Sequence, residues 1–244
     1  GNAGGRPTFG QRSPRFVDKG DEAELGNTQL NAMQASNIDM SLEHYMDSTG
    51  ALSVGLFYKD IDDFIFATDL AGSSDRWQDY DQVASYRNGK TASIKGVELA
   101  YSQKLSQLAA PFDGLIVAAS ITWSDSHAEI LSYQQGEASR RTIDLPNQSD
   151  VIGNLVIGYE KNGLMLRLAS NYKSDYLLAV EDLTSSQGDI YQSAHMQIDV
   201  SSAYNINDQL KISFDISNLG DEPYYSYQHQ SRYNAQYEEY GPTY

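Results

Sequence analysis

The feature that most constrains the fold of this chain is a period of two in hydrophobicity, which recurs along most of its length. Successive side chains of a β-strand point to opposite faces of a sheet, so this alternation predicts strands with one apolar and one polar face. Helical periodicity is weak throughout. Strands are therefore predicted over residues 35–46, 51–67, 84–105, 115–126, 150–160, 164–177, 190–204 and 209–217, with a further strand beginning near residue 237.

The connections between these predicted strands alternate in length. The short ones are Asp47–Gly50, Ser106–Asp113, Lys161–Gly163 and Asn205–Asp208, which are rich in the Gly, Asn and Asp that turns use. The long ones fall near residues 68–83, 127–149, 178–189 and 218–236. This order is typical of outer-membrane barrels, which have short turns at one end and long loops at the other. A soluble β-sandwich has no reason to place all its long loops at one end.

One face of the predicted strands contains no Lys, Arg, Asp or Glu. It reads Leu52/Val54/Leu56/Tyr58, Val97/Leu99/Tyr101, Leu115/Val117/Ala119/Ile121/Trp123, Leu155/Ile157/Tyr159, Leu164/Leu166/Leu168/Ser170/Tyr172, Met196/Ile198/Val200/Ser202/Tyr204 and Leu210/Ile212/Phe214/Ile216. A Lys or Arg near the middle of a bilayer would cost about 2–4 kcal/mol, so this absence is expected of a lipid-facing surface. The opposite face is polar and is predicted to line a wet lumen, with Glu98, Asn154, Arg167, Asn171, Gln197, Asp199, Lys211 and Asp215. The pattern predicts an all-β, transmembrane, antiparallel up-and-down β-barrel.

Aromatic residues end the apolar face on both sides. Tyr58, Trp123 and Tyr172 end it toward the long loops, and Tyr101, Tyr159 and Tyr204 end it toward the short turns. Tyr and Trp favour the interfaces of a membrane, so these residues predict two interfacial girdles. A soluble sandwich or barrel is the alternative, because its inner faces also alternate and its strand ends often contain Tyr.

Composition excludes several classes of protein. No run of about 18 apolar residues exists, so no ordinary transmembrane helix is predicted. The net charge of −16 argues against a nucleic-acid partner, because no basic stripe is present to contact phosphates. The chain has no cysteine, which excludes disulfides and thiolate metal sites. Adjacent acidic pairs such as Asp62–Asp63 point to opposite faces of a strand, and no nucleophile motif occurs. We therefore expect no enzymatic activity, no cofactor and no metal site.

Several segments, taken in order, resemble TonB-dependent receptors. They are GNTQL from Gly26, GLFYKDIDDFI from Gly55, ASIKGVELAYSQKL from Ala92, LPNQSDVIGNLVIGYEKNG from Leu145, ISNLGDEPYY from Ile216 and QYEEYGPTY from Gln236. The chain departs from the family pattern at Thr28, where the family has Pro, and at Pro242, where it often has Arg. The resemblance implies that the chain is the C-terminal part of the barrel, about nine of about 22 strands, with its last strand cut off at Tyr244. Residues 1–34 would then be an extracellular loop segment and residues 35–244 barrel wall.

The resemblance also implies a function in the outer membrane of a Gram-negative cell. The expected activity is TonB-coupled import of a scarce nutrient of the oligosaccharide or ferric siderophore class. TonB would be contacted through a segment preceding Gly1. Membrane lipid and lipopolysaccharide would surround the barrel. Two other functions remain open: a passive porin-like or structural barrel, and a soluble secreted all-β glycan-binding domain.

Ligand capture would then fall to residues in the long loops. The candidates are aromatic residues, which can stack on a sugar or siderophore ring, and basic residues, which can hold a carboxylate or phosphate. They are Trp77, Tyr80, Tyr86, Arg140, Arg141, Tyr224, Tyr225, Tyr227, His229, Arg232 and Tyr233. The alternative role for each is packing and solvation of its loop.

Overall fold

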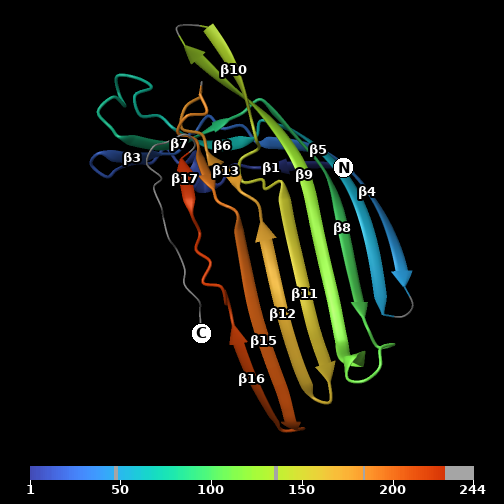
Figure 1. Ribbon diagram of the computed structural model, residues 1–244. Helices are drawn as coiled ribbons and strands as arrows, with labels where there is room; N and C mark the ends of the chain where they lie inside the picture. Colours follow the sequence, from blue (N-terminus) through green and yellow to red (C-terminus); the bar gives the residue numbers. More distant parts are fainter. Residues whose placement is uncertain (47–48, 135–136, 184, 229–244) are drawn as a thin grey trace.

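The computed structural model describes residues 1–244 except 47–48, 135–136, 184 and 229–244. Its main feature is a tall, curved antiparallel sheet of 10 strands (Figure 1). The order across this sheet is β1 (Asn2–Gly5), β4 (Met33–Met46), β5 (Gly50–Asp62), β8 (Thr91–Lys104), β9 (Leu115–Gln134), β11 (Val151–Lys161), β12 (Leu164–Lys173), β15 (His195–Asn207) and β16 (Leu210–Ile216), with β10 (Glu137–Ile143) pairing on β9. Neighbouring strands of the wall follow one another in sequence order. The predicted all-β, antiparallel up-and-down architecture is therefore confirmed.

Two smaller sheets lie at one end of the tall sheet (Figure 1). The first has four strands in the order β2 (Phe16–Asp18), β3 (Glu22–Leu25), β7 (Gln82–Asn88) and β6 (Ile65–Asp69). The second has three, in the order β13 (Tyr176–Ala179), β14 (Ile190–Gln192) and β17 (Ser226–Gln228). Helix α1 (Phe9–Arg12) precedes β2, and a short 3-10 helix, Phe112–Gly114, precedes β9. We call the two small sheets, α1, β10 and their connections the loop layer.

Some predicted strands are divided where they enter the loop layer. The sequence predicts one strand over residues 51–67, whereas the structure has β5 and β6, separated at Asp63, whose φ is 56°. Opposite it, β7 and β8 are separated at Gly89, where a Cβ atom would lie 2.0 Å from the Phe64 ring. Because Phe64 occupies that space, the β6–β7 hairpin leaves the wall instead of extending it. Alternation alone cannot reveal such a bend, since both halves keep the period of two.

Residues 1–34, predicted as a loop segment, contain four short elements. Strand β1 pairs with β4 at the edge of the wall, with Asn2 opposite Ser36 and Gly5 opposite Met33. Helix α1 and strands β2 and β3 belong to the loop layer. No helix in the described ranges is both long and apolar enough to cross a bilayer.

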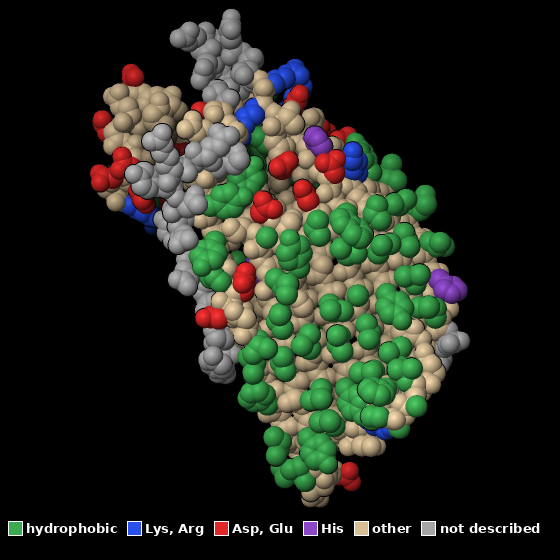
Figure 2. All heavy atoms as spheres, in the orientation of Figure 1, with side chains coloured by type: hydrophobic (Ala, Val, Ile, Leu, Met, Phe, Trp, Pro, Cys, Tyr) green, Lys and Arg blue, Asp and Glu red, His purple; other side chains and the backbone are tan. Residues whose placement is uncertain are grey.

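Strand register brings the predicted apolar residues onto one surface. Leu52, Val54 and Leu56 of β5 lie opposite Tyr101, Leu99 and Val97 of β8. On the other side of β5, Met40 lies opposite Leu56. These side chains point away from the concave side and remain uncovered, with Leu56 50% exposed. Figure 2 shows the resulting apolar surface across the wall, with acidic and basic side chains gathered above it.

The short turns at the far end of the wall follow the sequence signals closely. Asn162 and Gly163 both have positive φ, 51° and 77°, as a two-residue hairpin turn requires. At the next turn, the side chain of Asn207 accepts hydrogen bonds from the backbone N–H groups of Gln209 and Leu210, both at 2.9 Å. Local chemistry therefore sets both of these turns.

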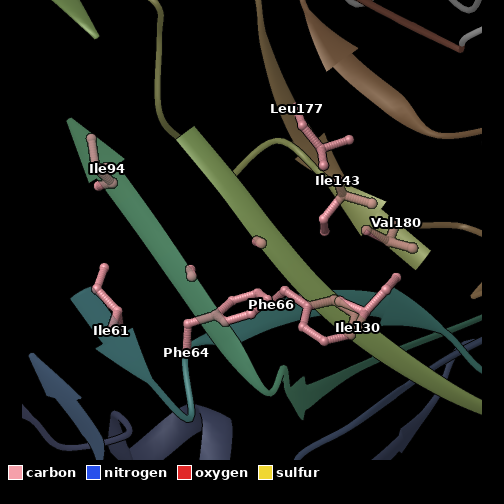
Figure 3. Packing of buried hydrophobic residues seen from close by; sticks show 10 residues of the cluster. Ile61, Phe64, Phe66, Ile94, Ile130, Ile143, Leu177 and Val180 are labelled. Carbon is pink, nitrogen blue, oxygen red and sulfur yellow. The ribbon is translucent and has the colours of Figure 1, made fainter. Parts of the chain in front are cut away.

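The main hydrophobic core lies between the concave side of the wall and the loop layer. Ile61, Ile94 and Ile130 contribute from the wall, and they pack with Phe64 and Phe66 from the β6 segment (Figure 3). Leu177 and Val180 reach the same cluster from the β13 segment. The sequence analysis predicts a polar concave side from residues such as Glu98 and Asn154. Next to the loop layer this side has apolar residues instead, and two loop segments fold onto them.

Candidate functional site

The loop layer contains all the described candidate residues for ligand capture, but the structure does not gather them into one site. They form separate groups around β7, around β10 and around β17. His229, Arg232 and Tyr233 lie outside the described residues.

Trp77 and Tyr80 belong to the core of the four-stranded sheet. Trp77 is 8% exposed and packs with Ala23 and Val83. Its ring lies 5.8 Å from that of Phe16, and the guanidinium of Arg76 lies 4.3 Å from its centroid. The hydroxyl of Tyr80 donates to Asp18 at 3.4 Å, and burial together with the Asp18 charge raises the pKa of Tyr80. In this arrangement, the indole stabilises the layer and does not face outward. Sequence reasoning missed Phe16, which lies in a strand of only three residues with no extended pattern.

Tyr86 lines a groove of about 450 Å³ between the N-terminal segment and β7. The other residues of the groove are Thr8, Gly10, Gln11, Arg15, Val17, Glu24, Leu25, Gly26 and Ala84. At Gly26 the groove has no room for a side chain, because the turn after α1 packs directly on this residue. A Cβ atom at Gly26 would lie 2.2 Å from the Ser13 carbonyl oxygen. Within the described part of the chain, the guanidinium of Arg15 has no ion-pair partner. The groove therefore combines a free cation with an aromatic side chain, and only Tyr86 was predicted.

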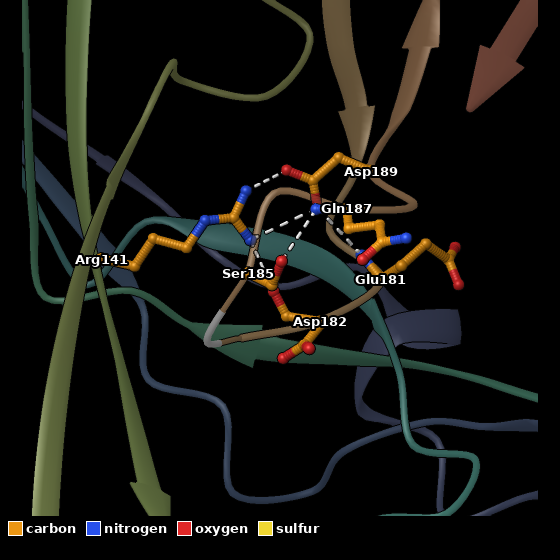
Figure 4. Close-up of polar contacts among 6 residues, drawn as sticks. All are labelled: Arg141, Glu181, Asp182, Ser185, Gln187 and Asp189. Atoms are coloured by element: carbon orange, nitrogen blue, oxygen red, sulfur yellow. Dashed lines mark hydrogen bonds and ion pairs between the residues drawn. The ribbon is translucent and has the colours of Figure 1, made fainter. Parts of the chain in front are cut away.

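Arg140 and Arg141 are adjacent in β10 and point in opposite directions. Arg140 is exposed, and its guanidinium lies 3.5 Å from the Glu129 carboxylate. Arg141 is 13% exposed and forms an ion pair with Asp189, whose side chain is completely buried. Its guanidinium also donates to the backbone carbonyl of Asp182 at 2.5 Å (Figure 4). Arg141 therefore holds the loop between β13 and β14, and the two arginines do not form a joint anion site.

A second carboxyl beside this ion pair is perturbed. Burial, followed by the nearby charges of Asp69 and Asp189, raises the pKa of Glu181 from 4.5 to about 7. The backbone N–H of Glu181 donates to Asp189 at 3.3 Å. Neither Glu181 nor Asp189 stands out in the sequence, because their partners Asp69 and Arg141 are distant along the chain.

Tyr224, Tyr225 and Tyr227 follow β16 and pack along the neighbouring strands. Tyr224 stacks on His195 with ring centroids 3.8 Å apart, and Tyr227 stacks on Tyr191 at 5.8 Å. The Tyr227 hydroxyl donates to Asp175 at 3.3 Å. The Tyr225 carbonyl accepts a hydrogen bond from the Ser193 N–H at 2.8 Å. The rings of Tyr224 and Tyr227 are therefore engaged in stacking, whereas Tyr225 is held through its backbone.

The ISNLGDEPYY motif owes its shape to Asn218. This residue has a φ of 51°, and its side chain both donates to the Glu222 carbonyl at 3.1 Å and accepts from the Glu222 N–H at 3.0 Å. Asp199 on the adjacent strand accepts from the Asn218 N–H at 2.9 Å. Asn tolerates positive φ and closes local turns with its amide, so this bend needs Asn at this position. The bend directs the chain from β16 toward Tyr224 and β17.

The six aromatic residues predicted as girdles lie on the outward surface of the wall. Tyr58, Trp123 and Tyr172 lie toward the loop layer, and Tyr101, Tyr159 and Tyr204 lie toward the short turns. Directly above Trp123 the outward residues become charged. Lys95 lies 3.1 Å from Asp125, and His127 lies 3.6 Å from the same carboxylate. In the described residues, no group of three potential ligands could hold a metal ion.

Comparison with known proteins identifies the relatives of this wall. A family model described as TonB dependent receptor-like, beta-barrel, matches residues 1–219. Among solved structures, the copper transporter OprC is similar with a TM-score of 0.62 and 15% identity, over 99% of this chain and 34% of that one. The ferric enterobactin receptor PfeA of Pseudomonas aeruginosa has a TM-score of 0.56 and 15% identity, over 91% and 32%. The ferric citrate transporter FecA has a TM-score of 0.56 and 17% identity, over 86% and 30%. No curated protein matches by sequence.

The chain thus spans about a third of the length of these solved structures. At such identities, the structural similarity establishes a shared fold.

Proposed function

Because this chain belongs to the TonB-dependent receptor-like β-barrel family, we propose that it is part of the wall of a receptor that imports a scarce nutrient by TonB-coupled transport. The family match over residues 1–219 is the observation on which this proposal rests. The polar concave side below the loop layer supports it, because a translocation path needs a wall that water and a polar solute can contact. The proposed partners are TonB, a small nutrient molecule, and the lipid and lipopolysaccharide around the barrel.

Two broader expectations follow from the family itself. Its barrels reside in the outer membrane of Gram-negative bacteria, which confirms the predicted location. Its members transport solutes and are not enzymes, which confirms the expectation of a non-enzymatic protein. The apolar outward surface fits this location, since the wall faces hydrocarbon there.

Energy coupling separates the proposed importer from a passive barrel. Uptake of a labelled nutrient should require both the receptor gene and TonB, and a proton uncoupler should abolish it. A strain without the receptor but with TonB provides the matched control. Uptake that persists in a strain lacking TonB would contradict coupled import and favour the porin-like alternative.

We propose oligosaccharides and ferric siderophores as the ligand classes, with the groove beside Tyr86 as a contact surface. A groove lined by both a tyrosine and an arginine suits both classes, because sugars and catecholates stack on rings, and siderophores also present anionic groups. The solved relatives are described as receptors or transporters for ferric enterobactin, ferric citrate and copper. Arg15 and Tyr86 would supply the charge and the ring.

Calorimetric titration of the intact receptor in detergent tests this proposal. The panel should contain neutral oligosaccharides and ferric siderophores. For the class that binds, Arg15→Ala and Tyr86→Ala should each weaken binding about tenfold, the loss of roughly one charge-assisted hydrogen bond or one stacked ring. Arg6→Ala is the control, because Arg6 is equally exposed but does not line the groove. Unchanged affinity in both groove variants would exclude the groove as a contact surface.

We further propose that the aromatic girdles mark the two lipid interfaces and that Lys95 and His127 lie at the level of the outer headgroups. Both are outward-facing, exposed and directly above Trp123. Fluorescence quenching of Trp123 by lipids brominated at different depths measures its position. Strongest quenching by bromine at the middle of the acyl chains would contradict an interfacial position.

A further inference from the structure

Two loop segments that are distant in sequence contact each other beside β6. The residues after Tyr176 run onto the edge of β6, where Val180 forms a parallel bridge with Thr68. The Val180 N–H donates to the Ala67 carbonyl at 3.3 Å. Val180 and Thr68 are both buried, so water does not compete for this contact. We call residues 177–182 the strap.

The strap is anchored at one end by apolar packing. Leu177 and Val180 are fully buried and belong to the main core with Ile143 and Phe66 (Figure 3). Because this cluster also includes Ile130 of β9, the strap presses the β6 segment against the concave side of the wall. Its position therefore determines whether that part of the wall is covered.

The other end of the strap lies in a crowded acidic environment. The parallel bridge between Val180 and Thr68 brings Glu181 alongside Asp69 of β6, and the charges of Asp69 and Asp189 both act on the Glu181 carboxyl. Asp69 already accepts the N–H groups of Ala71 and Val83, at 2.8 and 2.7 Å. The cation of this group is Arg141 on β10, whose guanidinium is committed to Asp189 and to the Asp182 carbonyl (Figure 4). Glu181 therefore lies beside two other carboxyl groups, of which Asp189 is paired with Arg141.

We propose that the strap is a proton-controlled latch: it stays docked on β6 while the Glu181 carboxyl holds its proton and is released from β6 when that carboxyl ionises. A neutral Glu181 can donate its proton in a hydrogen bond to Asp69. An ionised Glu181 cannot donate, and it adds one further negative charge, in a half-buried position, to those of Asp69 and Asp189. Release of the strap returns the Glu181 carboxylate to water.

The direction of the pH effect follows from linkage. Burial and the two neighbouring carboxylates raise the pKa of Glu181 to about 7 in the docked strap, against an ordinary value of 4.5. The docked form therefore binds the proton more tightly than the released form. Docking is strongest below pH 4.5, weakens as the pH rises toward 7, and changes no further above that. Since Glu181 is only half-buried, we expect the ratio of docked to released strap to fall about tenfold to a hundredfold between pH 5 and pH 8.

A distance measurement across the contact tests the latch. The chain has no cysteine, so spin labels can be attached at Ser74→Cys in the β6–β7 hairpin and Ser186→Cys beyond the strap, both of which are exposed. In the intact receptor, double electron–electron resonance should give one short distance at pH 5. A longer distance should gain population as the pH rises to 8. A distance distribution that is identical at both pH values overturns the proposal.

The Glu181→Gln variant identifies the group responsible. Gln keeps the size of the side chain and has no charge, so the short distance should persist at pH 8. The control is Glu22→Gln, which neutralises an exposed acid of β3 and should keep the pH response of the labelled parent. A parental pH response in Glu181→Gln overturns the assignment to Glu181. The titration of the labelled parent remains decisive even where a variant folds poorly.

Discussion

The wall has opposite polarity in its two parts. Below the loop layer, apolar side chains such as Leu168 face outward, and polar ones such as Asn154 and Arg167 face the concave side. Next to the loop layer the order is reversed: Ile94 and Ile130 are buried on the concave side, while Asp125 faces outward. Strands with the same alternation therefore place their apolar residues on the outward face in one part of the wall and on the concave face in the other.

Strand β9 passes through both parts. Its outward residues change from apolar to charged between Trp123 and Asp125, and its concave residues become buried from Ser126 to Ile130. In the lower part we propose that the outward face meets lipid, which accounts for the absence of charged side chains there. In the upper part the outward face has exposed charged side chains such as Asp125, and the loops that fold onto the concave face make burial of apolar side chains favourable there. The face of the wall that is apolar therefore changes with what covers each face, although the geometry of the strand stays the same.

The largest effect is expected where the upper part buries charge. Arg141→Ala should destabilise the loop layer by about 3–5 kcal/mol, because it leaves the Asp189 carboxylate buried without its cation. Limited proteolysis and denaturant unfolding of the intact receptor measure this loss. The double variant Arg141→Ala/Asp189→Asn should recover part of the stability. A cost below about 1 kcal/mol for Arg141→Ala would mean that water replaces the guanidinium.

Truncation of apolar residues sharpens the comparison between the two parts. Ile130→Ala should cost about 2–5 kcal/mol, because it opens a cavity at a fully buried position. Leu168→Ala in the lower part should cost less, because the Leu168 side chain is 39% exposed and detergent fills the space. Denaturant midpoints of the two variants in the same detergent decide the order. Equal losses would contradict the claim that only the upper part has a packed core.

Insertion of charge probes the lower part. Leu168→Arg should destabilise the barrel by about 2–4 kcal/mol when it is folded into lipid, because the guanidinium would face hydrocarbon. Asn154→Arg is the matched control on the concave face, where the same side chain meets water. Unfolding in lipid vesicles provides the measurement, and a larger loss for Asn154→Arg would reverse the assignment of the two faces.

The smallest effect is expected on the outward face of the upper part. Lys95→Ala removes an exposed ion pair with Asp125 and should change stability by about 0.2–1 kcal/mol. The difference from the unsubstituted protein should shrink further in high salt, because both groups are open to solvent. A loss above about 2 kcal/mol that salt leaves unchanged would show that Lys95 contributes to packing and not only to the ion pair.

Much of the wall could be predicted because the relevant signals are local. Alternation around Leu52, Val54 and Leu56 placed these residues on one face, and the register confirms it. Asn162–Gly163 predicted a tight turn because few other pairs accept positive φ at both positions. The candidate residues Trp77 and Arg141 show the limit of this reasoning. An exposed ring or cation and a buried one look the same in a sequence, and here Trp77 packs in a small core while Arg141 pairs with Asp189.

By itself, the sequence determined the strands of the lower wall, their faces, the short turns and the family, since each depends on residues within a few positions of one another or on an ordered set of motifs. Only the tertiary structure decided where the β6 and β13 segments fold. It thereby set the apolar concave surface, the groove beside Tyr86, and the carboxyl groups around Arg141. These features join residues far apart along the chain, and their energies come from burial that exists only once the loops have closed over the wall.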